Sequence, residues 1–103
     1  MTEIPESLQR PPVLYWTRID KRHRRTGNTQ HLNLSTGRPD PIPHFLGIHQ
    51  DSGSFYLSHL DAEGTFITDT MHDSIQDAMS QAEFEFVGTS ATWVQVGSRD
   101  NAT

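Results

Sequence analysis

Three short apolar runs in the middle of the chain, each followed or preceded by a glycine-containing turn, constrain the fold more than any other feature. The runs span residues 45–50, 54–61 and 65–70, and the turns between them occupy residues 51–53 and 62–64. Glycine adopts positive φ without steric cost, which tight hairpin turns require. The pattern therefore predicts a meander of three antiparallel strands.

Further strands are predicted on both sides of the meander. Residues 13–20 are rich in β-branched and aromatic side chains, residues 29–34 place two leucines on one face, and residues 93–96 alternate again. Residues 35–43 hold three prolines and a glycine, so we expect a loop there.

A single amphipathic helix is predicted from Asp73 to Phe86. Asp73 is suited to cap its start, with Gln76 three residues later as an approximate capping box, and Gly88 is suited to cap its end. One apolar stripe has helical spacing and should face the sheet: Ile75, Ala78, Met79, Ala82 and Phe86. The predicted class is α+β, an antiparallel β-meander of about five to six strands with one helix packed on one face, in the order β-β-β-β-β-α-β.

The length of 103 residues suits one domain. We expect a flexible N-terminal arm at 1–12, a single α+β domain at 13–96 and a flexible C-terminal tail at 97–103. The chain has no cysteine, which excludes disulfides and thiolate chemistry and fits a reducing compartment. No apolar run is long enough to span a membrane, and residues 1–12 lack the pattern of a secretion signal, so the expected location is cytoplasmic.

The meander is expected to be apolar on both faces. If each turn is a three-residue loop, Gln50 opposes Ser54 and Asp61 opposes Thr65. One face then collects Phe45, Gly47, His49, Phe55, Leu57, His59 and Ile67, and the other collects Leu46, Ile48, Tyr56, Leu60 and Phe66. One helix covers only one face. The second face needs either the N-terminal hairpin, with Leu14 and Trp16, or a second copy of the chain in a homodimer.

Charge is unevenly distributed along the sequence. The net charge is −5, yet residues 1–39 carry seven Lys or Arg against three acids, and residues 40–103 carry ten acids against one arginine. Candidate anion-binding side chains lie together at the tip of a predicted hairpin: Lys21, Arg22, Arg24 and Arg25. On an acidic domain, so few cations would bind nucleic acid weakly and in a salt-sensitive way, so this is the less favoured function.

The histidines and acids do not form a recognisable catalytic or metal motif. His49 and His59 would be roughly 13 Å apart on one face, too far to share an ion. A cluster of Asp69, His72 and Asp73 lacks a nucleophile and an oxyanion site, so no catalytic residue, metal or cofactor is assigned. The alternative of a small-molecule binder or enzyme needs a pocket between sheet and helix, for which the candidate lining is Tyr56, His59 and Trp93.

Residues 69–87, reading DTMHDSIQDAMSQAEFEFV and followed by Trp93, resemble the closing strand, helix and strand of small acidic bacterial α+β domains, including immunity proteins of toxin systems. The resemblance implies a small acidic protein that works by binding, often by blocking a basic toxin surface. The leading hypothesis is accordingly a non-enzymatic protein-binding module that uses an acidic helix face. The candidate residues on that face are Asp77, Gln81, Phe84 and Glu85.

Overall fold

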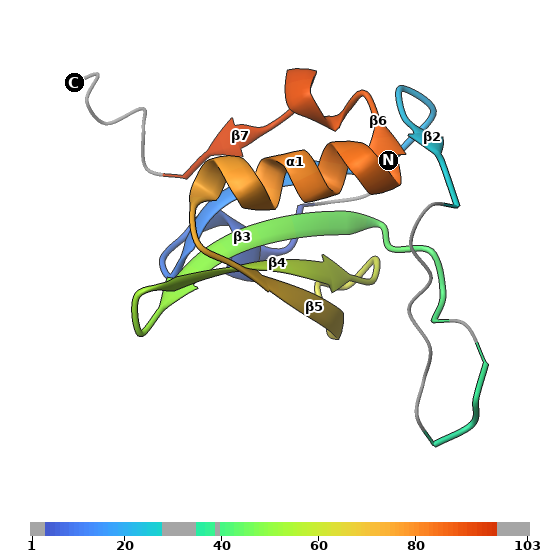
Figure 1. The fold of residues 1–103 in the computed structure, drawn as a ribbon, viewed down its shortest axis with the longest axis horizontal. Coiled ribbons are helices and arrows are strands. Elements are labelled where there is room, and N and C mark those ends of the chain that lie inside the picture. Colours follow the sequence, from blue (N-terminus) through green and yellow to red (C-terminus); the bar gives the residue numbers. More distant parts are fainter. Residues whose placement is uncertain (1–3, 28–34, 39, 97–103) are drawn as a thin grey trace.

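The computed structural model describes residues 4–27, 35–38 and 40–96, and it confirms an α+β fold in which one helix packs on an antiparallel sheet (Figure 1). The sheet has five strands in the order β5-β4-β3-β1-β7. Their bounds are β1 Val13–Arg18, β3 Phe45–Asp51, β4 Ser54–Leu60, β5 Phe66–His72 and β7 Val94–Gln95. A two-residue ribbon pairs β2 (Arg24–Arg25) with β6 (Phe86–Val87) beside the end of the helix.

The turn between β3 and β4 is one residue shorter than expected. Asp51 pairs with Ser54, so the loop consists of Ser52 and Gly53, with φ of 54° and 84°. Two successive positive φ angles match the twist of a two-residue hairpin. The expected pairing of Gln50 with Ser54 is wrong, and the side chains of β4 exchange faces relative to β3.

The corrected register sorts the apolar side chains between the two faces. The face beneath the helix carries Leu46, Ile48, Leu57 and His59, and the opposite face, here called the second face, carries Phe45, Gly47, His49, Tyr56, Ser58 and Leu60. Next to the turn at residues 62–64, Asp61 opposes Thr65 as expected, because its N–H donates to the Thr65 carbonyl. A bulge between His59 and Leu60 then shifts β5 by one residue.

The helix α1 spans Ile75–Glu85, within the predicted range. Ser74, rather than Asp73, is the N-cap: its backbone is extended and its Oγ accepts a hydrogen bond of 3.0 Å from the Asp77 N–H. Most of the predicted stripe is confirmed, because Ala78, Ala82 and Phe86 are buried in the core and Met79 packs against it. Ile75 is only half-buried and is not part of that cluster. Gly88 does not cap α1; with φ of 107° it begins the short 3-10 helix η2 (Thr89–Ala91).

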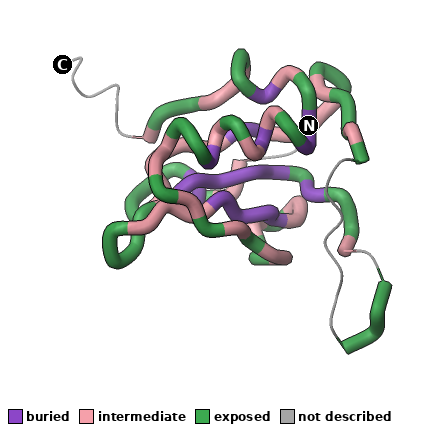
Figure 2. Tube along the Cα trace, viewed as in Figure 1, coloured by how far each residue is buried: buried purple, intermediate pink, exposed green. Residues whose placement is uncertain are grey.

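Residues of the predicted N-terminal arm cover part of the second face. The 3-10 helix η1 (Glu6–Gln9) buries Leu8 against Phe45 and Leu60, and Trp16 packs against them. Figure 2 shows that the buried positions gather in the strands beneath α1 and along α1. The expectation of a loose arm is therefore wrong for residues 4–9, because Leu8 supplies an apolar side chain that the sheet can bury. The expected N-terminal hairpin over this face is wrong, because β1, which carries Leu14 and Trp16, pairs with β3 as a strand of the sheet itself. Trp16 packs against the cluster around Leu8 from that strand, whereas Leu14 is not among the cluster residues.

Other expected segments are partly outside the described residues. The predicted strand at 29–34 and the C-terminal tail at 97–103 lie outside them. The described positions of the proline-rich segment, 35–38 and 40–43, contain no helix or strand, as expected for a loop. Within the described parts of the chain, no helix combines the length and apolar character needed to cross a membrane.

Candidate functional site

A buried polar cluster joins the sheet to the end of α1. His59 Nε2 lies 2.8 Å from Glu85 Oε1, and the Gln81 side-chain amide donates to Glu85 Oε2 at 2.6 Å. The cavity beside this cluster measures about 20 Å³, which admits roughly one water molecule. The cluster therefore ties α1 to β4, and its geometry does not support a hydrolytic site.

The basic tract does not project as a hairpin tip. Arg22 forms a bidentate ion pair with Asp20, at 2.9 and 3.0 Å, which lowers the pKa of that carboxyl to about 2. The His23 side chain is fully buried, with Nε2 2.9 Å from Thr92 Oγ1. Arg24 and Arg25 lie in the β2–β6 ribbon. Lys21, Arg24 and Arg25 remain exposed cations, but they sit on an anchored segment.

The predicted helix face is only partly exposed. Asp77 and Phe84 are exposed, Phe84 by 51%, and Gln81 is half-buried. Glu85 is buried and cannot serve an outer face. The sequence already held the signal for this correction, because Glu85 lies three residues after Ala82 and therefore beside the buried stripe.

The predicted pocket of Tyr56, His59 and Trp93 does not form. Tyr56 is on the second face, where its ring stacks on His49 with centroids 5.3 Å apart and its hydroxyl donates to Met71 Sδ at 3.7 Å. His59 is on the helix side of the sheet, and Trp93 packs at the margin of the core there. The structure does not bring the three together.

A groove of about 280 Å³ lies on the second face. The walls come from the N-terminal segment and from β5. Its lining residues are Ser7, Leu8, Pro12, Val13, Gly47, His49, Ser58, Leu60, Gly64 and Phe66. At the base of the groove, Gly47 pairs with Ser58. Both residues are small, whereas their neighbours on the same face are much larger, so the surface is recessed at this pair. A Cβ on Gly47 would lie 3.2 Å from Leu8 Cδ2 and would enter the groove.

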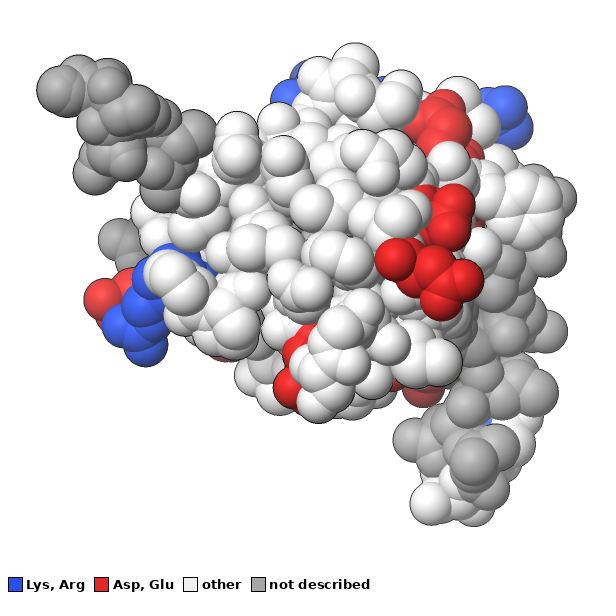
Figure 3. Space-filling view, turned by 60° about the vertical axis from the view of Figure 1, so that its left-hand side comes forward, with Lys and Arg blue, Asp and Glu red and all other residues white. Residues whose placement is uncertain are grey.

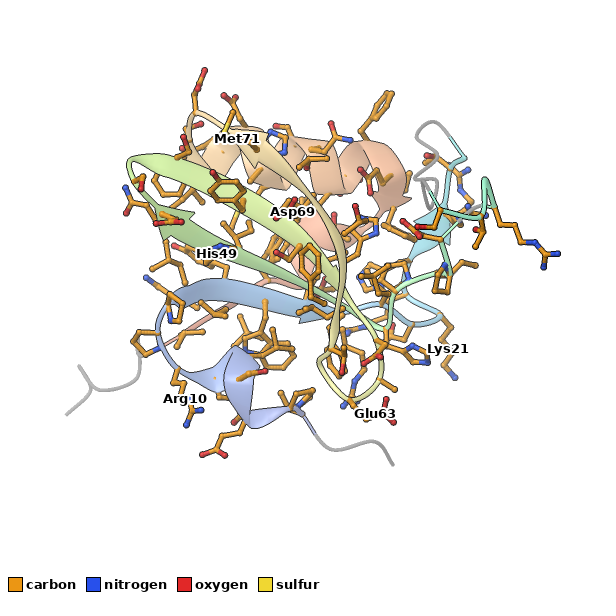
Figure 4. All side chains as sticks on the ribbon, turned by 90° about the horizontal axis from the view of Figure 1, so that it is seen from below. Arg10, Lys21, His49, Glu63, Asp69 and Met71 are labelled. Carbon is orange, nitrogen blue, oxygen red and sulfur yellow. The ribbon has the colours of Figure 1, made fainter. Side chains whose placement is uncertain are left out.

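The groove opens onto an apolar rim along β5. Phe66 and Met71 are 57% and 64% exposed and lie on the second face, since they pair with Leu60 and Tyr56. Asp69 lies between them on the same face, and Glu63 is in the preceding turn (Figure 4). We define the second-face site as this groove together with Phe66, Asp69 and Met71. It went unpredicted because it depends on the length of the β3–β4 turn and on the docking of Leu8.

Neither a metal site among the described residues nor a similar known protein indicates a function for this chain. Among the described residues, no group of three or more His, Asp or Glu side chains is placed to hold a metal ion. Comparisons with protein-family models, with curated proteins and with solved structures find no match to this chain. The functional argument therefore rests on the surfaces of the molecule itself.

Proposed function

We propose that this protein is a non-enzymatic protein-binding module that holds a polypeptide segment against its second-face site. One observation carries the proposal: Phe66, which lines the groove of about 280 Å³, and Met71, farther along the same face of β5, are both large apolar side chains that are more than half exposed. Contiguous apolar surface of this kind typically marks an interaction site. The groove lining is itself rich in apolar side chains, which favours a partner that buries apolar residues.

A polypeptide fits this site better than a small molecule does. The groove is at the lower limit of the roughly 300 to 1,000 Å³ typical of small-molecule pockets. The site also extends along β5 beyond the residues that line the groove, past Asp69 to the exposed side chain of Met71. An occupant that covers all of it must be extended.

The charge of the site favours a basic partner. Asp69 and Glu63 are both exposed beside the apolar rim, and the whole chain has a net charge of −5. Figure 3, a side view that does not face this site, shows that carboxylates also gather in a band elsewhere on the molecule. Complementary charge accelerates association and selects among partners.

The same proposal accommodates the immunity-type role inferred from residues 69–93, in which the partner would be a toxin with a basic surface. It moves the contact from the outer face of α1 to the second-face site, because Glu85 is buried. We keep the cytoplasm as the proposed compartment, and the cysteine-free sequence fits a reducing compartment.

The test uses a displayed library of random linear peptides, selected on the immobilised protein. We expect selected peptides to lose at least tenfold in affinity with Met71→Ser or Phe66→Ser, measured by calorimetry. The matched control is Phe84→Ser, which removes a comparably exposed apolar side chain from α1 and should leave the affinity unchanged. Peptides whose affinity falls with Phe84→Ser but not with Met71→Ser or Phe66→Ser would contradict the proposal. They would indicate that the binding site is the outer face of α1.

A further inference from the structure

The strand β5 forms a long edge of the sheet. It ends the strand order, and β4 is its only strand neighbour among the described residues. Along its seven residues, Phe66–His72, the edge away from β4 presents backbone N–H and C=O groups that another strand can pair with. The opposite edge strand, β7, has only two residues and offers far fewer backbone groups for pairing.

Asp69 at the centre of β5 determines which strand can pair there. In an antiparallel pairing of β5 with a second copy, the register that matches all seven residues places Asp69 opposite Asp69. Like charges directly opposite each other destabilise a strand pair, whereas opposite charges stabilise it. The exposed carboxylate therefore disfavours self-pairing and favours a strand with a basic residue at this position.

The apolar side chains on either side of Asp69 determine which other residues a strand paired with β5 should carry. Met71 lies two residues along on the same face, and the bulge between His59 and Leu60 brings Phe66 onto that face as well. A paired strand presents its residues to one face at every second position. Its complement to β5 thus has an apolar residue opposite Met71, two positions from a basic residue opposite Asp69. On the other side of the basic residue, a second apolar residue at two positions faces Phe66, which is three residues from Asp69, because the bulge takes up the extra residue of β5.

We propose that β5 accepts an additional strand from a partner protein, an extended segment with Lys or Arg flanked at two residues on each side by apolar side chains. This inference rests on the proposed function, since it names the partner of the second-face site. Backbone hydrogen bonds supply part of the binding and the side-chain pattern supplies the selectivity. Asp69 distinguishes a partner strand from a second copy of this chain, because its carboxylate attracts a basic residue and repels another Asp69.

The experiment compares two capped peptides, TVTKTLT and TVTETLT, by NMR titration at low salt. The lysine peptide should bind about fivefold more tightly than the glutamate peptide, and its binding should slow hydrogen exchange of β5 amides and leave β7 amides unaffected. Asp69→Lys should reverse the preference. Asp77→Lys, the same charge change at an exposed position on α1, should not. Unchanged backbone shifts elsewhere show that each variant is folded.

The outcomes separate this inference from the proposed function. Equal binding of the two peptides, failure of the lysine peptide to bind at millimolar concentration, or an unreversed preference in Asp69→Lys would overturn strand addition. The proposed function still stands in those cases if Met71→Ser weakens the library-selected peptides. Light scattering should find the wild-type chain monomeric, and a dimer in which β5 amides are protected would also overturn the inference.

Discussion

Glu83 organises the chain that follows α1. Its carboxylate accepts hydrogen bonds from the backbone N–H groups of Gly88 and Ser90, both at 3.0 Å, and from Thr89 Oγ1 at 3.3 Å. These donors stabilise the charged form, so they hold the pKa of Glu83 below its usual range, with the backbone bonds as the main cause. These hydrogen bonds from one side chain hold the start of η2 in place, and η2 leads the chain back to β7.

Glu83→Gln should lower the free energy of unfolding by about 1–2 kcal/mol, because the amide is a weaker acceptor for three donors. The folded pKa of Glu83 is lowered, so its contribution is complete above the ordinary carboxyl range and is lost as the pH falls through the folded pKa. Urea denaturation at neutral and at acidic pH should show the two proteins converging as the pH falls. The control is Glu63→Gln, the same change at an exposed turn. An equal loss in both variants would contradict this role for Glu83.

At the scale of elements, the β3–β4 hairpin shows how a turn controls a surface. Ser52 has φ of 54° and Gly53 has φ of 84°, so two residues suffice to reverse the chain. A third loop residue would transfer every β4 side chain to the other face, and Ser58 would no longer pair with Gly47. The groove therefore depends on the length of this turn.

Ser52→Asn should raise the free energy of unfolding by about 0.5 kcal/mol or more, because asparagine tolerates positive φ and is preferred before glycine in this turn. Ser52→Val should lower it, since β-branched residues are strained there. Thermal denaturation followed by circular dichroism measures both. Ser54→Asn, in a strand position next to the turn, should not stabilise the protein. If all three substitutions had the same sign, the turn conformation would not be the cause.

The elements themselves were predictable, and the surfaces that they build were only partly so. Hydrophobic periodicity and turn glycines are local signals, and they located three strands of the meander and the helix stripe ending at Phe86. Phe84 and Asp77 were correctly placed on the outside of α1. The second-face site was missed because it requires a turn one residue shorter and a long-range contact by Leu8, neither of which leaves a periodic pattern.

At the scale of the whole molecule, the N-terminal segment closes a second, smaller core. Leu8 packs with Phe45 and Leu60 on the side of the sheet that α1 leaves uncovered. Pro5 lies against the β4–β5 turn, where a Cβ on Gly64 would come within 2.7 Å of it. Residues 4–9 are thus part of the folded domain, and they form one wall of the groove.

Leu8→Ala should lower the free energy of unfolding by about 2–4 kcal/mol, because it removes a fully buried side chain and leaves a cavity. Ile42→Ala removes an apolar side chain that is 54% exposed and should change stability by less than about 1 kcal/mol. Urea denaturation of both variants makes the comparison. A loss for Leu8→Ala no larger than that for Ile42→Ala would show that the N-terminal segment is not held as the structure describes.

The position of β1 in the strand order has a consequence for how the chain folds. The strands β3, β4 and β5 and the helix α1 follow one another along the chain, so their contacts form between near neighbours. The strand β1 instead joins β3 to β7, and the pairing of Tyr15 with Gln95 connects opposite ends of the described chain. Contacts so distant in sequence close late, because loop-closure entropy opposes them. During synthesis the meander, α1 and the pairing of β1 with β3 can therefore form first, whereas the pairing of β1 with β7 forms only after β7 has left the ribosome.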